Sequence, residues 1–469
     1  MKTHFRSLKP SVYKFGATLL SFLVPFIAIC IMFGCEQDYL TSEPVTDVSQ
    51  LQTEIKMLPG FSSKSNLMPE KMMSILSEPA ALPESAAGLA TGKTVKIGMI
   101  IEDEFSPYTK YGAELAMFEI NQAGGVLGLP ADTDNAKNEP NYTAGKITGG
   151  VMGYPIALII KDNQDDPALS AELTEEMIKK DKVLAIIGPA YSRNALDITS
   201  IAQFYEVPLV TTEATRPEIT SAGDYVFMAA STTEFQGQTM ARFAWESLNA
   251  RKAALFIQSG EPESEGNANA FKDNFMTLGG AIVNTEYYSE GDTVFNTQLE
   301  SIAANAPDVI YMPGFPPEVP IAINQARITP QQNATGITAT FLGGDGWDFV
   351  ELITMGGAAV EGSYYTAFYA TDSPTSNNND FIDAYQRMFG TDPEVDAALG
   401  YDALRLIATA IRRAGSLDAA DIRDELAATY DYRGATHIHR YDENRHPEKS
   451  IVIKCISKGK AYCYKLVEP

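Results

Sequence analysis

Short apolar runs alternate with amphipathic stretches along the chain from residue 94 onward. The runs at 94–101 (TVKIGMII), 183–190 (VLAIIGPA) and 207–212 (VPLVTT) have the length of buried strands. Between the last two, residues 192–206 repeat apolar side chains at helical spacing. Strands and helices that alternate at such short intervals predict βαβ units and a parallel sheet.

The alternation restarts at 224–231 (DYVFMAAS) and continues with a helical stretch at 234–250 and a strand-like run at 252–258. This restart predicts a second α/β lobe of similar build. Two open α/β sheets that face each other bind ligands at the carboxyl ends of their strands. Thr211 and Thr212, which end one of the predicted strands, are therefore expected at the edge of a ligand cleft.

The first 34 residues have the pattern of an export signal. Basic residues precede the apolar stretch 15–34, which ends in Met32-Phe33-Gly34-Cys35 and resembles a bacterial lipobox. We expect residues 1–34 to be a signal peptide of the lipoprotein type and Cys35 to carry the lipid. An uncleaved signal anchor is the alternative. Residues 35–93 are rich in Ser, Glu, Pro and Ala without sustained periodicity, so we predict a tether there.

Both interpretations place the protein in the cell envelope, on the periplasmic or extracellular face and attached to a membrane. The chain is strongly acidic, with a formal net charge of −24. This charge argues against nucleic-acid binding, which needs a clustered basic surface. The sequence motifs of serine hydrolases, P-loop enzymes, zinc proteases and dinucleotide-binding enzymes are absent. We therefore expect no enzymatic activity and no cofactor.

The histidines and cysteines outside the signal were considered for metal binding and for a disulfide. His437 and His439 would share one face of a strand, but no Cys or carboxylate stands at a spacing that indicates a metal site. Cys455 and Cys463 flank residues 458–460, where a three-residue hairpin loop would place them opposite each other. An oxidising compartment permits that disulfide, and two free, half-buried thiols are the alternative.

From residue 94 to residue 464 the chain resembles the type I periplasmic binding proteins, specifically the leucine/isoleucine/valine-binding group that feeds ABC importers. The resemblance is spread over segments in a fixed order, including "VLAIIGPAYSRNALDITSIAQFYEVPLVTTEAT", "FNTQLESIAANAPDVIYMPGF" and "FLGGDGW". It implies an α/β fold of two doubly wound parallel-sheet lobes, joined by a three-segment hinge, with the ligand cleft between them.

The resemblance also implies where each lobe begins and ends. The first lobe would comprise 94–230 and 368–432, and the second 231–367 and 433–469. The chain would cross between them near 230–232, 365–370 and 431–441.

The binding positions of the family can be transferred where the motifs align. Ser192 would donate to a ligand carboxylate, and the start of a helix there would favour an anion; simple capping of that helix is the alternative. The backbone carbonyl of Glu213 would accept from the ligand ammonium, and Thr215 would meet both ligand groups. Asp345 would pair with the ammonium, and a turn aspartate before Gly346 is its alternative.

Three aromatic residues complete the set of expected ligand contacts. Phe315 resembles an aromatic of the pocket wall, with ordinary core packing as the alternative, and Tyr191 adjoins Ser192. Tyr108 would replace an aromatic lid residue, although the loop before it is shorter than in the family.

The chain departs from the family at two acidic positions. Glu213 stands where the family has a small residue, and its side chain would either point into solvent or add negative charge to the cleft. Glu263 and Ser264 replace an aromatic of the second lobe. A ligand with extra positive charge, or a polar amide-like solute, would suit such a cleft.

The resemblance implies a solute-binding lipoprotein that closes on an amino acid or related small solute and presents it to an ABC permease. An envelope scaffold that binds another protein, or a sensory receptor of the same fold, are the alternatives.

Overall fold

The computed structural model describes residues 94–104, 106–123, 125, 153–327, 336–374 and 378–469. The predicted signal peptide at 1–34, the lipidation site Cys35 and the predicted tether at 35–93 lie outside these residues. Among the helices that the structure describes, none has the length and apolar character needed to cross a membrane.

The first sheet has the strand order β2-β1-β3-β4-β5, and its paired strands are parallel. Its strands are β1 (Val95–Ile101), β2 (Ile156–Asp162), β3 (Ala185–Ile187), β4 (Leu209–Thr211) and β5 (Val226–Met228). The strand cores are buried apolar residues, as the short runs in the sequence indicated. Both faces of this sheet are covered, which a parallel sheet requires.

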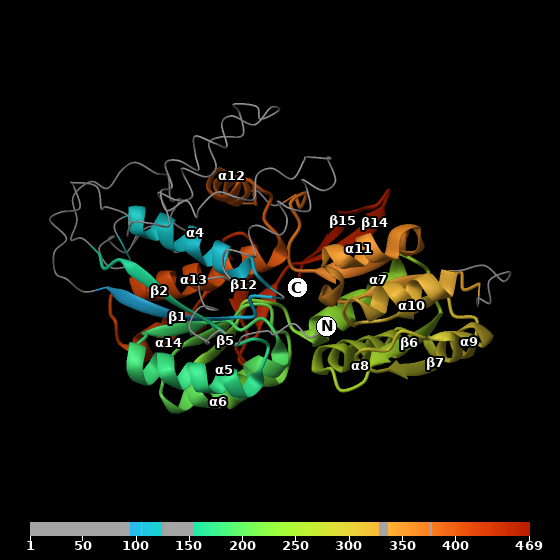
Figure 1. The fold of residues 1–469 in the computed structure, drawn as a ribbon, viewed down its shortest axis with the longest axis horizontal. Coiled ribbons are helices and arrows are strands. Elements are labelled where there is room, and N and C mark those ends of the chain that lie inside the picture. The colour runs from blue at the N-terminus through green and yellow to red at the C-terminus, as the bar shows by residue number, and fades with distance from the viewer. Residues whose placement is uncertain (1–93, 105, 124, 126–152, 328–335, 375–377) are drawn as a thin grey trace, which may run out of the picture. The chain divides into compact units, whose positions relative to one another are not determined.

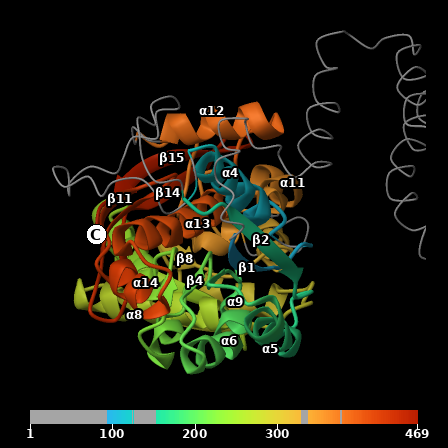
Figure 2. The same cartoon turned by 90° about the vertical axis from the view of Figure 1, so that its left-hand side faces the viewer.

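Figures 1 and 2 show one group of helices above this sheet and another below it. The upper group is α4 (Thr109–Gln122), α12 (Asn378–Phe389) and α13 (Val395–Ala414), and α14 (Ala419–Ala427) joins the same hydrophobic core as α13. The lower group is α5 (Pro167–Glu176) and α6 (Ser192–Phe204). Asp166 caps α5 by accepting hydrogen bonds from the backbone N–H groups of Ala168 and Leu169, with Pro167 at the first helical position.

The second sheet has the strand order β15-β14-β10-β9-β8-β6-β7. Its strands are β6 (Lys252–Gln258), β7 (Ala281–Tyr288), β8 (Val309–Tyr311), β9 (Thr340–Gly343), β10 (Tyr364–Ala367), β14 (Ile451–Ser457) and β15 (Lys460–Val467). The helices α7 (Thr233–Glu246) and α8 (Pro262–Thr277) cover one face. The other face carries α9 (Asn296–Ala304), α10 (Glu318–Arg327) and α11 (Val350–Gly356). The prediction of two doubly wound lobes is confirmed.

The chain passes between the lobes after β5, after β10 and after β13. The small antiparallel sheet β11 (Tyr430–Arg433), β12 (His437–Tyr441) and β13 (Pro447–Lys449) packs on the first lobe. Residues 433–449, which were predicted for the second lobe, therefore contact the first. The reason is apolar burial: Ile438 and Tyr441 join the first core, and the Tyr441 hydroxyl donates to the Met228 carbonyl at 2.8 Å.

The predicted disulfide between Cys455 and Cys463 is wrong, because both thiols are free. The hairpin turns through only two residues, so that Cys455 pairs with Tyr462 and Cys463 pairs with Lys454. Paired residues share a face of the sheet and successive residues alternate, so the two sulfur atoms lie on opposite faces. The sequence did not distinguish this two-residue turn from the three-residue loop that would pair Cys455 with Cys463.

A close contact between α4 and α13 fixes the upper helical layer above the first sheet. A Cβ atom added at Gly400 would overlap the Thr109 carbonyl, and one added at Gly112 would overlap the Ala397 carbonyl. Both obstacles are backbone, which cannot turn aside as a side chain can. The helices therefore need glycine at both positions.

We predict that Gly400→Ala lowers the free energy of unfolding by about 1–3 kcal/mol, because the added methyl group must push the two helices apart. Urea unfolding followed by circular dichroism measures this change. Asp421→Ala, at an exposed position of α14, is the control and should change the value by less than about 0.5 kcal/mol. Equal effects of the two substitutions would contradict the contact.

Candidate ligand-binding site

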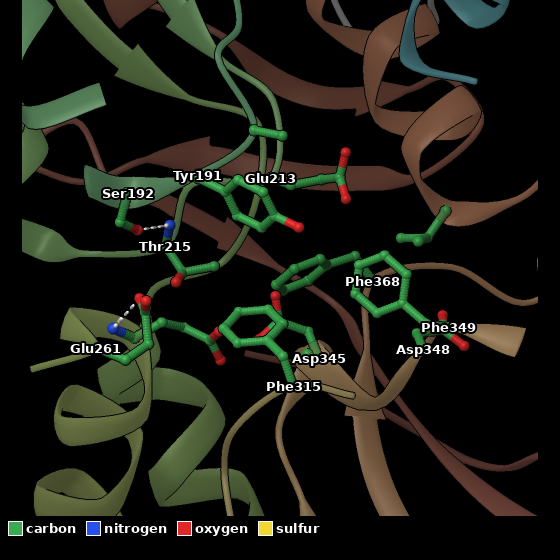
Figure 3. A pocket seen from close by; sticks show the side chains of 14 residues that line it. Tyr191, Ser192, Glu213, Thr215, Glu261, Phe315, Asp345, Asp348, Phe349 and Phe368 are labelled. Atoms are coloured by element: carbon green, nitrogen blue, oxygen red, sulfur yellow. Dashed lines mark hydrogen bonds between the residues drawn. The ribbon is translucent and has the colours of Figure 1, made fainter. Parts of the chain in front are cut away.

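The carboxyl ends of β3, β4 and β9 lead into loops that line one pocket (Figure 3). After β3 the chain turns at Gly188, whose φ of +82° is one that glycine adopts readily. A Cβ atom added at this position would overlap the Ile100 carbonyl oxygen. The pocket, together with the solvent space to which it opens, spans about 490 Å³ not filled by protein atoms. Its lining residues are Ala190, Tyr191, Ser192, Glu213, Thr215, Glu261, Glu263, Phe315, Asp345, Gly346, Asp348, Phe349, Phe368 and Val395.

Ser192 is the first residue of α6, but it does not cap the helix. Its side-chain oxygen accepts hydrogen bonds from the backbone N–H groups of Thr215 (3.1 Å) and Arg216 (3.3 Å). The capping alternative is therefore wrong. A serine oxygen that accepts in this way keeps its hydroxyl hydrogen for another acceptor. Ser192 thus joins the loop after β4 to the start of α6 and still offers a donor to the pocket.

Thr215 and Asp345 present buried oxygen atoms that lack a partner among the described residues. Thr215 is 1% exposed, and its Oγ1 atom makes no hydrogen bond there. The Oδ1 atom of Asp345 is also buried and unpaired. Buried polar atoms cost free energy unless they are hydrogen-bonded. Because both atoms line the same pocket, they are suited to hold a polar ligand.

Aromatic rings provide the apolar part of the pocket. Tyr191 and Phe315 meet edge to face with ring centroids 5.9 Å apart, and they come from opposite lobes. Phe349 and Phe368 also line the pocket. Tyr108 does not line it: its ring is 37% exposed and lies beside Tyr111, while its backbone N–H donates to Asp396.

The pocket collects carboxyl groups from both lobes. Figure 3 shows Glu213 on the side of the first lobe and Glu261 and Asp345 on the side of the second. Glu213 therefore faces the pocket and not bulk solvent. Burial raises its pKa, and the neighbouring carboxyl groups of Asp396 and Glu102 raise it further.

Glu263 and Asp345 form a pair within the second lobe. Glu263 is 5% exposed and accepts a hydrogen bond from Asn267 at 2.9 Å, and its carboxyl group interacts directly with that of Asp345. Burial raises the pKa of both groups, to about 6 for Asp345, and the Asp345 charge raises that of Glu263 further. The interaction between the two carboxyl groups therefore disfavours the state in which both are ionised.

The cations next to the pocket are already paired. Arg193 bridges the lobes by contacting Asp165 in the first and Glu261 in the second, the latter at 3.0 Å. Lys454 contacts Asp348 at 2.7 Å. Glu213, Glu263 and Asp345 make no ion pair with any residue in the described ranges. The pocket therefore has a deficit of positive charge.

The structure places six of the seven predicted ligand contacts around one pocket; Tyr108 is the exception. The sequence analysis missed Glu261, Asp348, Phe349, Phe368 and Val395 as lining residues. Phe368 lies in the predicted second crossing, which was the one available signal for it. Glu261, Asp348 and Phe349 lie in loops and Val395 begins α13, and whether these residues reach the pocket depends on how the two lobes face each other.

Another group of side chains arises from residues far apart in the sequence. Ligand atoms of His437, His439 and Glu468 lie within 4.8 Å of one another. The sequence analysis did not connect Glu468, because it follows His439 by 29 residues. Each imidazole is already hydrogen-bonded to a carboxylate, His437 to Asp431 and His439 to Glu468, both at 2.8 Å.

Comparisons with known proteins agree with this architecture. The sequence profile of the periplasmic binding proteins matches residues 94–460. A leucine-, isoleucine-, valine-, threonine- and alanine-binding protein of Pseudomonas aeruginosa is 26% identical over 281 residues, which cover 60% of this chain and 73% of that protein.

Two solved structures are also similar. A leucine-binding protein of Thermotoga maritima is 31% identical with a TM-score of 0.68, and the alignment covers 80% of this chain and 99% of that one. A branched-chain amino acid transporter substrate-binding protein of Streptococcus pneumoniae, solved with isoleucine, is 29% identical with a TM-score of 0.68; coverage is 80% of this chain and 100% of that one.

We predict that Glu263→Gln stabilises the empty protein, and more so at pH 8 than at pH 5. The folded pKa of Glu263 is raised above its unfolded value of about 4.3, so the folded state binds more protons and loses stability as the pH rises past that value. Glutamine has no proton to lose. At a pH above the folded pKa of Glu263, the substitution should raise the free energy of unfolding by about 1.4 kcal/mol for each unit by which folding raises that pKa.

Urea unfolding at the two pH values measures this effect. Glu172→Gln, which removes an exposed carboxylate of α5, is the control and should show no such gain. A Glu263→Gln protein that is less stable than the wild type at pH 8 would contradict the buried, unneutralised pair.

Proposed function

The chain belongs to the periplasmic binding protein family, in the group of the leucine-, isoleucine- and valine-binding proteins, and we propose that it captures an amino acid between its lobes for an ABC importer. It is a binding protein and not an enzyme. The observation that carries the proposal is the convergence of Ser192, Thr215 and Asp345 on one pocket. These residues come from separate loops, and together they match the charges of a free amino acid.

The two charged groups of an amino acid need different partners. The ligand carboxylate would lie at the start of α6, where the Ser192 hydroxyl can donate and the helix end is positively polarised. The ammonium would lie against Asp345, whose Oδ1 atom has no hydrogen-bond partner among the described residues. Thr215 stands between the two with an unpaired hydroxyl. Burial of a zwitterion costs little only when all of its charged groups are paired, so the three residues would act as a set.

The relatives support this proposal through what they bind. The Streptococcus pneumoniae structure contains isoleucine, and a Desulfitobacterium hafniense substrate-binding protein of the same fold contains leucine. The space in the pocket also favours solute capture over a scaffold role, because a scaffold would have no need of an unfilled cleft lined by unpaired oxygen atoms.

We further propose that residues 1–34 direct export, that Cys35 carries the lipid anchor and that 35–93 form the tether. The binding unit would then work in the cell envelope and hand its ligand to a membrane permease. Mass spectrometry of the purified N-terminal peptide would show whether Cys35 is its first residue and is acylated.

Isothermal titration against the twenty standard amino acids tests ligand capture, using the full-length chain in mild detergent after bound solute has been stripped from it. We expect saturable, one-to-one binding of at least one member. Absence of heat with every member would contradict the proposal.

We predict that Asp345→Asn weakens binding of that amino acid by at least about 30-fold, since it leaves a buried ammonium unpaired. Thr215→Val, which removes a hydroxyl at similar size, should weaken binding by about 5- to 30-fold. The matched controls are Asp273→Asn and Thr354→Val at exposed positions of the second lobe, and titration should show no change for either. Retained affinity in both site variants would exclude this ligand position.

The pH dependence of binding follows from the same residue. Burial raises the pKa of Asp345 to about 6, with the Gln236, Glu263 and Asp348 side chains facing it. Only the ionised carboxylate can hold an ammonium, so the dissociation constant should rise about tenfold for each pH unit below 6. Titrations at pH 5, 6 and 8 measure this, and equal affinity at pH 5 and 8 would contradict the assignment.

A further inference from the structure

Carboxyl side chains from opposite lobes lie at the pocket in two groups. Glu213, Glu263 and Asp345 line the pocket, whereas Glu102 and Asp396 lie beside Glu213 without lining it. The first acidic group consists of Glu213, Glu102 and Asp396, and the second of Glu263 and Asp345. Glu213 and Asp345 are close enough for their charges to interact. An ordinary amino acid offers one ammonium, which suits the second acidic group. The first acidic group would then face a bound ligand without a cation.

The other members of the first acidic group have partners within the protein. Glu102 accepts hydrogen bonds from Asn163 and Asn194 at 2.9 and 2.7 Å and from the backbone N–H of Ala190. Asp396 accepts from the backbone N–H of Tyr108 at 3.0 Å and from that of Ala397. All of these hydrogen-bond donors belong to the first lobe. The carboxyl groups of Glu102 and Asp396 therefore have little need of a further donor from a ligand.

Glu213 is different, because its contacts are weak. Among the described residues, its recorded hydrogen bond is a 3.5 Å contact from the Thr109 hydroxyl, and it makes no ion pair. The charged groups that surround it are Glu102 after β1, Asp396 on α13 and Asp345 after β9, all of them acidic. Arg193, a cation of the first lobe next to the pocket, is engaged by Asp165 and Glu261. The Glu213 carboxylate is thus the group that lacks a counter-charge.

Acidic residues alone do not define a site, but a second feature of the pocket indicates a ligand. The Thr215 hydroxyl is 1% exposed and unpaired, and it lies in the loop that carries Glu213. Because Glu213 and Thr215 line the same pocket, a ligand that contacts Thr215 is within the same space as Glu213. The aromatic rings of Tyr191 and Phe315 line this pocket too and would contact a carbon chain.

We propose that the ligand is an amino acid with a positively charged side chain, which places its α-ammonium against Asp345 and its side-chain cation against Glu213. This inference rests on the proposed function, because it assumes that Ser192 and Thr215 receive the carboxylate. A ligand with two cationic groups and one carboxylate supplies one cation to each acidic group. Such a ligand also accounts for the presence of glutamate at position 213. If only the backbone carbonyl of this residue contacted the ligand, any side chain would serve there.

The proton balance of the pocket agrees with this assignment. Burial raises the pKa of Glu213, and its acidic neighbours raise it further. A ligand cation would lower that pKa, so binding should release protons at any pH at which Glu213 of the empty pocket is protonated. Titrations in two buffers of different ionisation enthalpy would detect the release.

The test compares three compounds that differ by one group. L-Lysine carries both cations and the carboxylate, L-norleucine lacks the side-chain ammonium, and cadaverine lacks the carboxylate. With the full-length chain stripped of solute, we expect L-lysine to bind at least about tenfold tighter than either of the others. L-Ornithine and L-arginine in the same series measure the preferred side-chain length.

Variants at position 213 show which residue causes the preference. Glu213→Gln should weaken L-lysine binding by about 10- to 100-fold and leave L-norleucine unchanged or tighter, because it removes a charge-assisted contact at constant size. Glu172→Gln, at an exposed position of α5 in the same lobe, is the control for loss of charge and should leave both affinities unchanged. Thermal unfolding of each variant verifies that it is folded.

The outcomes separate this inference from the proposed function. Equal or tighter binding of L-norleucine or L-leucine by the wild type would overturn the cationic ligand and leave amino-acid capture intact. Binding of cadaverine but of no amino acid would overturn both, as would no binding of any compound. A lysine preference that survives in Glu213→Gln would overturn the role of Glu213.

Discussion

A carboxylate that is buried away from water is costly unless hydrogen-bond donors or a cation replace the water molecules that it loses. The pocket between the two lobes of this protein is lined by carboxyl groups, and some of them lack such partners. Arg193 and Lys454 neutralise Glu261 and Asp348. Glu213 and the Glu263–Asp345 pair have no cation among the described residues. The protein stores free energy in this arrangement, which a cationic ligand could recover on binding.

The fold brings these carboxyl groups together from separate segments of the chain that share no sequence motif. In each lobe the carboxyl ends of parallel strands lie at one edge of the sheet, so the residues that follow β3 and β4 reach the same cleft as those that follow β9. The Ser192 hydroxyl then joins two of these loops by accepting N–H groups of Thr215 and Arg216. Because both lobes contribute charged groups, the electric field in the pocket depends on the separation of the lobes.

Local patterns were sufficient to predict the two α/β lobes, and the family resemblance supplied the candidate ligand contacts, six of which line one pocket. Buried strands and amphipathic helices produce periodicities that a single sequence displays, and Ser192, Thr215 and Asp345 follow strand ends that could be located in this way. The register of β14 and β15 could not be predicted, because a one-residue change in loop length moves Cys463 to the other face of the sheet. Tyr108 was misplaced for a similar reason, since its short loop gives no indication of where the ring points. Glu261 and Phe368 required knowledge of how the two lobes face each other.

The central claim concerns the charge of the natural ligand, and the most direct measurement is mass spectrometry of the small molecule released when the natively purified protein is denatured. We expect a stoichiometric compound with one carboxylate and two basic nitrogen groups. Stoichiometric release of a neutral amino acid, or of a solute without a basic nitrogen, would contradict the account.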